Sequence, residues 1–268
     1  MTDLTRTLEL LDKLVAFPTV SRDSNLILID WVQDLLAGAG FEVTRIWSPD
    51  RIKAGLFAQI GPKVNGGVCL SAHTDVVPVD GQIWTRPSFT LTDEGDRVFG
   101  RGTTDMKGFL ASALALAERV GKTPLSAPLS LSISYDEEIG CVGIQQMMPE
   151  LKGLIGKPRA VIVGEPTSMQ VAIGHKGKRA LGVTCHGQAG HSALAPDFVN
   201  AIHVAAEFVQ GIRGLQSRLA DGPKDASYSI PYSTVHIGKI TGGRALNIVP
   251  ADARLEMEFR HLLETPAH

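Results

Sequence analysis

The chain has 268 residues, of which 44% are hydrophobic and 20% charged, a balance typical of globular proteins rather than disordered ones. Its 26 basic and 28 acidic residues give a net charge of −2 with no basic block, so nothing favours binding to nucleic acid or to an anionic membrane surface. Three widely spaced cysteines without C-x-x-C spacing, an N-terminus without a signal-peptide pattern and a longest apolar run of only residues 109–117 predict a soluble, cytoplasmic protein.

The N-terminal part of the chain alternates between helical and strand patterns. Leu4, Leu8, Leu11 and Val15 recur at helical spacing, and a second helix is expected from Ser24 to about 38–40, burying Ile27, Trp31, Leu35 and Leu36. Further helices are expected over 106–120 and 140–151, a loop with a hairpin over 79–102, and strands over 41–47, 53–60, 68–71, 129–134 and 160–163. This alternation predicts an α/β sheet with helices on both faces.

The pattern changes after about residue 175. Strands are expected over 171–173, 178–186, 233–240 and 252–260, with one long amphipathic helix over 200–219. This order predicts a smaller α+β domain after the first one. We place the two domains at residues 1–175 and 176–268.

Ionisable side chains follow three of the predicted strands directly. They are His73, the run Asp136-Glu137-Glu138, and Glu165. In α/β sheets, sites collect at the carboxyl ends of the strands, so these side chains are expected to meet. His73 and Asp75 face the same side of a strand end, as a metal ligand and the carboxylate that orients it would. Asp105, just before a helical pattern, can reach the same metal.

The acidic run has two interpretations. Three adjacent carboxylates repel one another unless a cation compensates, and neighbouring glutamates can then divide the roles of metal ligand and general base. Alternatively, Asp136, Glu137 and Glu138 are a solvated helix N-terminus that complements the helix dipole. The other ionisable residues at strand ends favour the metal site.

Several other residues also have a simpler interpretation when each is taken alone. Glu165 before a proline is more often a turn residue, and His191 in a glycine-rich turn is more often a surface residue. Arg244 could be only a surface charge and Asn247 only a turn former. Cys141 is more readily a packed small residue than a nucleophile, because no histidine lies near it in sequence.

Taken in order, these motifs resemble the M20 family of dinuclear zinc amidohydrolases and peptidases. Residues 134–141 and 242–250 are most similar to the members of that family that release acetate from N-acetyl-L-ornithine. The motifs that carry the resemblance are His73-Thr-Asp75, Gly102-Thr-Thr-Asp105-Met-Lys107-Gly108, Asp136-Glu137-Glu138, Gly164-Glu165-Pro166 and Gly190-His191-Ser192.

The resemblance implies a role for each matching residue. His73, Asp105 and Glu165 would hold one Zn²⁺, and Asp105 would bridge to a second Zn²⁺ that Glu138 also binds, with Co²⁺ able to substitute. Asp75 would orient His73, and Glu137 would act as general base. The Asp105–Met106 peptide bond would be cis.

The resemblance also implies roles for the second domain. This inserted dimerisation (lid) domain would form a homodimer, and His191 would reach the partner's site to stabilise the oxyanion. Arg244 and Asn247 would contact the substrate carboxylate or amide. Family members continue past the end of this chain and supply a further histidine ligand near their C-terminus. His261 and His268 lie in the wrong domain to replace it, so we expect both domains to be incomplete and the chain's own activity to be weak or lost.

The function expected from the resemblance is hydrolysis of N-acetyl-L-ornithine to L-ornithine and acetate in arginine biosynthesis. The small-molecule substrate would be an N-acyl amino acid. Desuccinylation of succinyl-diaminopimelate, aminoacylase activity and dipeptidase activity remain alternatives within the family. Outside enzymes of this type, the chain could be a non-catalytic metal-binding or dimerising remnant, and a cysteine hydrolase is a distant third.

Overall fold

The computed structural model describes residues 3–265. It forms two compact units, Met1–Gln170 and Val171–His268, which we describe separately. Within the described residues, none of the helices combines the length and the apolar character needed to cross a bilayer.

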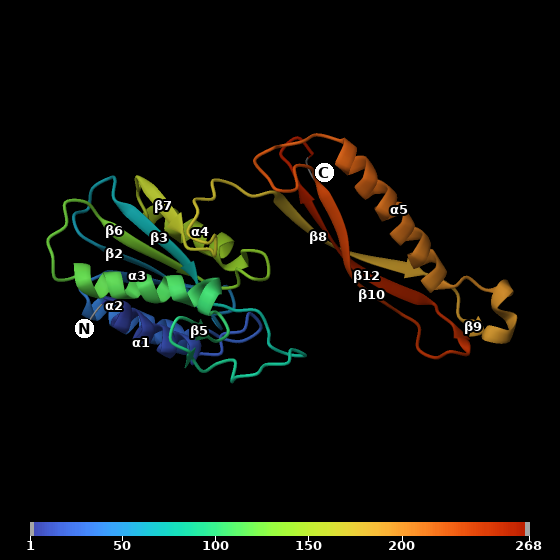
Figure 1. Ribbon diagram of the computed structural model, residues 1–268, viewed down its shortest axis with the longest axis horizontal. Coiled ribbons are helices and arrows are strands. Elements are labelled where there is room, and N and C mark those ends of the chain that lie inside the picture. The colour runs from blue at the N-terminus through green and yellow to red at the C-terminus, as the bar shows by residue number, and fades with distance from the viewer. Residues whose placement is uncertain (1–2, 266–268) are drawn as a thin grey trace. The chain divides into compact units, whose positions relative to one another are not determined.

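A five-stranded mixed sheet forms the centre of the first unit (Figure 1). Its order is β1-β2-β6-β3-β7. β3 pairs in parallel with both β6 and β7, whereas β2 is antiparallel to β1 and β6. The carboxyl ends of β3, β6 and β7 therefore lie at one edge of the sheet, which the alternating pattern predicted. The strand bounds are β1 Glu42–Trp47, β2 Ala54–Ile60, β3 Val68–His73, β6 Leu129–Ser134 and β7 Ala160–Val163.

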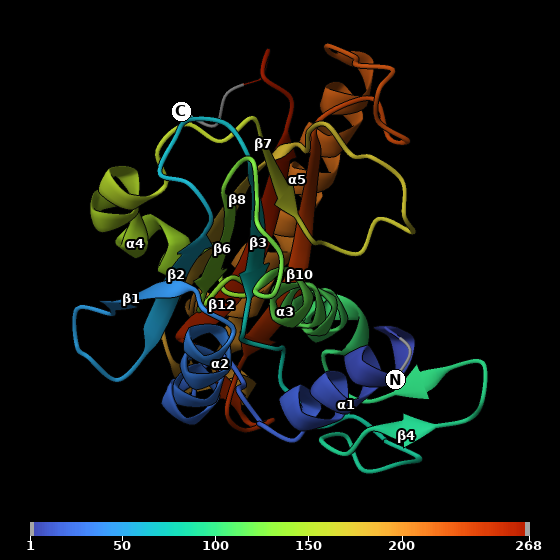
Figure 2. The ribbon, with the colours of Figure 1, turned by 90° about the vertical axis from the view of Figure 1, so that its left-hand side faces the viewer.

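Helices cover both faces of this sheet, as predicted. Three helices, α1 (Asp3–Val15), α2 (Leu26–Gly38) and α3 (Gly108–Val120), pack on one face, and α4 (Val142–Leu154) packs on the other (Figure 2). Because side chains alternate along a strand, β2 contributes to both layers. Leu56 joins the larger core under the three helices, whereas Phe57 packs with residues of α4.

The buried face of α2 differs from the expected one. Ile27 is 75% exposed, whereas Leu28, Ile29, Val32 and Leu36 are buried. The helix starts with four consecutive apolar residues, so its periodicity does not determine which of them face the core. Packing against the sheet selects the stripe that starts at Leu28.

The segment between β3 and α3 contains a short hairpin and an irregular turn. The hairpin of β4 (Thr92–Asp93) and β5 (Val98–Phe99) confirms the one expected in this loop. A π-helical turn, η1 (Thr103–Lys107), follows, and the Asp105–Met106 peptide bond in it is cis as expected. Regular helix begins at Gly108 rather than at Met106, because Asp105 and Met106 have non-helical backbone angles.

The second unit is an antiparallel sheet of order β10-β12-β8 with α5 against one face. This is the predicted α+β arrangement. The strand expected over 171–173 does not form: Val171 and Ile173 are 90% and 97% exposed, so these apolar residues have no core to join. The bounds are β8 Gly177–His186, β9 Gly190–His191, η2 Ser192–Asp197, α5 Ala201–Asp221, β10 Thr234–Gly242, β11 Ile248–Val249 and β12 Asp252–His261.

Candidate metal centre

His73, the last residue of β3, has a side chain that is only 1% exposed. Its Nδ1 lies 2.9 Å from the backbone oxygen of Asp75. If Nδ1 carries the proton and donates it to that carbonyl, Nε2 presents a lone pair, which is the state of a metal-binding imidazole. The polypeptide thus fixes the ring so that Nε2 faces the edge of the sheet.

Three carboxylates approach Nε2 of His73 from different parts of the chain. Asp105 Oδ1 lies 3.1 Å away, Glu165 Oε1 3.8 Å and Glu137 Oε2 3.9 Å. Asp105 comes from the turn before α3, Glu165 from the segment after β7, and Glu137 from the turn after β6. The chain folds so that ionisable residues up to about ninety positions apart in sequence share one imidazole.

Two groups of ligand atoms share His73. One joins it with Glu137 and Glu165, the other with Asp105 and Glu138, and in each group the atoms lie within 4.8 Å of one another. Neither group is the expected set of His73, Asp105 and Glu165, because the structure groups Glu165 with Glu137 and Asp105 with Glu138 around the shared His73. Either group has the mixture of imidazole nitrogen and carboxylate oxygen that divalent zinc binds.

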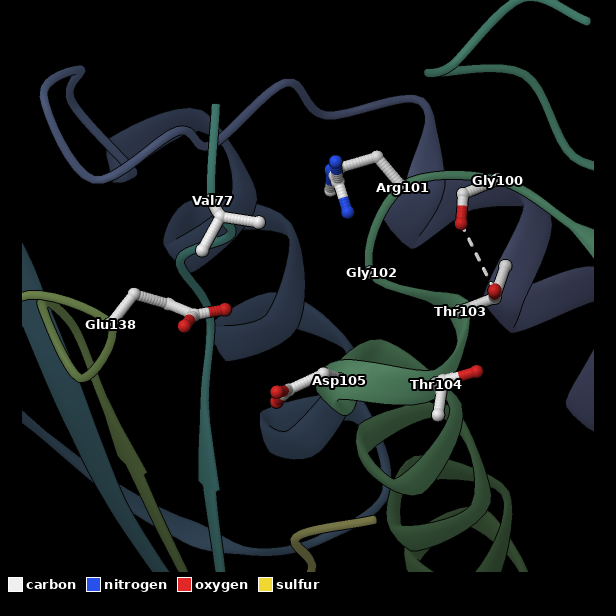
Figure 3. A pocket seen from close by; sticks show the side chains of 8 residues that line it. All are labelled: Val77, Gly100, Arg101, Gly102, Thr103, Thr104, Asp105 and Glu138. Atoms are coloured by element: carbon white, nitrogen blue, oxygen red, sulfur yellow. Dashed lines mark hydrogen bonds between the residues drawn. The ribbon is translucent and has the colours of Figure 1, made fainter. Parts of the chain in front are cut away.

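A pocket of about 240 Å³ opens beside this cluster. Figure 3 shows the carboxylates of Asp105 and Glu138 directed toward one another across the pocket, with the Arg101 side chain above them in this view. The remaining lining residues are Val77, Gly100, Gly102, Thr103 and Thr104. A small polar molecule can thus reach the same two carboxylates from solvent.

The ionisation of these groups reflects their crowding. Burial, together with the charge of Asp105, raises the pKa of Glu138 to about 7, and burial also raises the pKa of Glu165. Burial lowers the pKa of His73, but Asp75, Glu165 and Glu137 outweigh that effect and raise the pKa to about 9. The cluster holds more negative charge than one imidazole can balance, so a divalent cation fits this set of ligands.

Asp75 contacts the turn after β6 as well as the imidazole of His73. Its carboxylate accepts hydrogen bonds from the Ser21 hydroxyl at 2.7 Å and from the backbone N–H groups of Glu137 and Glu138 at 3.0 and 3.2 Å. Burial opposes its ionisation, but the His73 ring, Ser21 and the Glu137 N–H lower the pKa of Asp75. The distance from its Oδ1 to His73 Nδ1 is 3.4 Å, so the shorter contact of that ring is with the backbone.

Two buried lysines lie near the cluster: Lys107, which belongs to a motif quoted from the sequence without a role of its own, and Lys53, which was not singled out from the sequence as a site residue. Lys53 bonds to Asp136, and Lys107, fully buried, donates to the backbone oxygens of Leu14 and Phe17 at 2.9 and 2.7 Å. Burial lowers the pKa of Lys107 to about 7. The only sequence signal for Lys53 is that it stands at the start of an apolar strand, whereas Lys107 stands within a motif that carries the family resemblance.

The second unit brings together His191, expected to be catalytic, and Asn247, expected to bind substrate. β9 pairs with β11 so that Ile248 lies opposite His191, and the Ser192 N–H donates to the backbone carbonyl oxygen of Asn247 at 3.0 Å. The exposed His191 ring accepts a hydrogen bond from the Ala193 N–H. Arg244 is exposed in the loop that leads to β11.

Comparison with known proteins identifies the family. The model of Peptidase family M20/M25/M40 matches residues 69–256. Acetylornithine deacetylase from Yersinia pseudotuberculosis is 35% identical over 266 residues, covering 95% of this chain and 68% of the relative. The enzyme of that name from Shigella sonnei is also 35% identical, over 265 residues, covering 95% of this chain and 67% of the relative.

Solved structures show the same fold. An M20 family metallo-carboxypeptidase from Sulfolobus solfataricus superimposes with a TM-score of 0.78 at 21% identity, covering 97% of this chain and 72% of that one. Human carnosine dipeptidase 1 gives 0.71 at 16% identity, covering 98% and 70%. The match over residues 69–256 and the 35% identity show that the chain belongs to Peptidase family M20/M25/M40.

Proposed function

We propose that this chain is a zinc-dependent amidohydrolase that converts N-acetyl-L-ornithine to L-ornithine and acetate, a step of arginine biosynthesis. The observation that carries the proposal is the approach of Asp105, Glu137 and Glu165 to the single Nε2 of the buried His73. The choice of acetylornithine is supported by the relatives of that name at 35% identity. Membership of the family supports hydrolase activity. The identities of the substrate and of the metal are what we propose.

The proposed ligands are His73, Asp105 and Glu165 for one Zn²⁺, with Asp105 shared with a second that Glu138 also holds. When bound, such ions polarise the amide carbonyl and lower the pKa of the attacking water, and Co²⁺ can take their place. Neutralising the carboxylates of the cluster is the electrostatic reason for the ions to bind there.

Glu137 is the proposed general base. Its carboxylate takes a proton from water as the oxygen adds to the amide carbon, and it then gives that proton to the departing nitrogen as the C–N bond breaks. The Cys141 thiol donates to Glu137 Oε1 at 3.2 Å, while Oε2 faces His73. Asp75 accepts the Glu137 N–H, so the base is held through both its backbone and its side chain.

The second unit is proposed to supply the rest of the site as a lid and dimerisation domain. In a homodimer, His191 would stabilise the oxyanion in the partner's site, and Arg244 and Asn247 would bind the carboxylate or amide of the substrate. The pairing of β9 with β11, which sets His191 beside Asn247, supports a shared role for these residues. We place the enzyme in the cytoplasm, in keeping with three cysteines that do not form disulfide bonds.

The test begins with protein stripped of metal by a chelator. Release of free amine from N-acetyl-L-ornithine is followed as Zn²⁺ or Co²⁺ is added back, with N-succinyl-diaminopimelate, N-acetyl-methionine and a dipeptide as competing substrates. We expect turnover at a low rate, only with metal, and with the highest kcat/KM for N-acetyl-L-ornithine. A higher kcat/KM for another substrate would refute the assigned specificity, and turnover unaffected by chelation would refute the metal mechanism.

A further inference from the structure

Lys53, immediately before β2, is a buried cation beside the acidic turn. Its residue is 7% exposed, and its ammonium donates to the backbone oxygen of Ser21 and to Asp136 Oδ1, each at 2.5 Å. The Asp136 side chain is itself only 13% exposed. Burying two opposite charges requires close pairing and further hydrogen bonds, and both are present here.

The pair closes a ring of contacts around the turn that carries Glu137 and Glu138. Ser21 uses its carbonyl for Lys53 and its hydroxyl for Asp75. Asp75 in turn accepts the backbone N–H groups of Glu137 and Glu138. The turn is therefore held on one side by the carboxylate of Asp75 and on the other by the ammonium of Lys53.

The backbone of the turn makes this second attachment important. Asp136 has a φ of +53°, which is uncommon for a residue other than glycine. The hydrogen bonds that follow along the turn are local: the backbone N–H groups of Gly140 and Cys141 donate to the backbone oxygen of Glu137 at 2.8 Å. Without Lys53, the Asp136 carboxylate would be a buried charge without its cation, directly before the acidic Glu137 and Glu138, and this would favour a shift of the turn.

We propose that Lys53 is a positioning residue. Through Asp136 it fixes the turn that follows β6 so that Glu138 faces Asp105 as a metal ligand and Glu137 faces His73. The inference rests on the proposed metal site. It adds to that site a residue that contacts neither the metal nor the substrate. The competing explanation is that the Lys53–Asp136 pair only stabilises the fold. It predicts that loss of the pair lowers the melting temperature but leaves metal binding by the folded protein unchanged.

The experiment titrates metal-free protein with CoCl₂ and follows the visible absorption of bound cobalt, with thermal melting measured on the same samples. The variants are Lys53→Met, Asp136→Asn and the double substitution. Lys63→Met is the matched control, because Lys63 forms an exposed ion pair with Glu42 at 2.8 Å that includes no residue of the turn or of the metal cluster.

We expect Lys53→Met and Asp136→Asn to weaken cobalt binding about tenfold and to change its absorption, the size of effect typical of residues that orient ligands. Lys63→Met should match the wild type. The double variant should recover melting temperature, because it removes the unpaired buried charge, while its cobalt affinity stays low.

The inference is overturned if folded Lys53→Met binds cobalt with wild-type affinity and absorption, or if the double variant recovers cobalt affinity along with melting temperature. Should Lys53→Met fail to fold, Asp136→Asn tests the same contact alone, since Lys53 keeps the Ser21 carbonyl. The readout needs no substrate. Loss of cobalt affinity in a protein that does not hydrolyse N-acetyl-L-ornithine would therefore support the positioning role while refuting the proposed function.

Discussion

Gly164 lies directly before Glu165, and replacing it with alanine should displace a proposed metal ligand. A Cβ at this position would lie 2.0 Å from Cγ of Phe109. Carbon atoms normally approach to about 3.5 Å, so the two segments must separate by roughly 1.5 Å. Phe109, in the first turn of α3, packs against the main core and resists that movement. The backbone before Glu165 must then shift, which also strains the hydrogen bond from the Gly164 N–H to the Ser71 carbonyl at 3.1 Å.

A shift of this size exceeds what metal coordination tolerates. Zinc–oxygen bonds are about 2.0–2.2 Å long and vary by about 0.2 Å, so a displacement of roughly 1.5 Å removes Glu165 from the ligand set. We expect Gly164→Ala to lose the site that uses Glu165, with zinc affinity there lowered at least 10-fold to 100-fold. Overpacking should also lower the free energy of unfolding by about 1–3 kcal/mol.

Isothermal titration calorimetry with Zn²⁺ and thermal melting measure the two effects. Gly153→Ala is the control, because that glycine lies within α4 and a Cβ there meets nothing within 4 Å. The control should bind zinc normally and gain up to about 1 kcal/mol of helix stability. Wild-type zinc stoichiometry and affinity in Gly164→Ala would refute the assignment of Glu165 as a ligand.

Three further predictions concern the base, the thiol beside it and a distant ion pair. Glu137→Gln should keep zinc bound, as measured by metal analysis, while kcat falls about 10²-fold to 10⁴-fold, because the base is lost and the shape is kept; near-normal kcat would contradict this. Cys141→Ser should retain most activity and chelator sensitivity, whereas a cysteine hydrolase would be inactivated. Hydrogen bonds from Arg6 lower the pKa of Glu118, so their stabilisation is present above the unfolded pKa of about 4.3 and is lost as pH falls through the lower folded pKa. The difference in melting temperature between wild type and Glu118→Gln should therefore shrink below about pH 4, and a constant difference would refute the assignment.

Most of the first unit's architecture is predictable because its strands and helices differ in period. The convergence of His73, Asp136–Glu138 and Glu165 follows from one rule, that parallel strands present their carboxyl ends at the same edge. Asp105 can be placed near the same metal from its position just before a helical pattern, but its irregular turn has no periodic signal, and only the family resemblance gives it a ligand role.

The residues that sequence patterns do not predict depend on packing. Ile27 and Leu28 are both apolar and adjacent, and only contact with the sheet decides which one is buried. Val171 and Ile173 have strand-like composition, but apolar residues form a strand only where an edge or core receives them. Lys53 is only the first residue of a predicted strand in the sequence, and it is the fold that places Ser21 and Asp136 beside its ammonium.

The central claim is that the cluster around His73 binds two metal ions. Anomalous diffraction from crystals of the zinc-loaded protein tests it most directly. We expect two peaks about 3.5–4 Å apart, with Asp105 between them, one within about 2.2 Å of His73 Nε2 and the other beside Glu138. Zinc bound elsewhere, with His73 Nε2 unligated in fully loaded protein, would contradict the account.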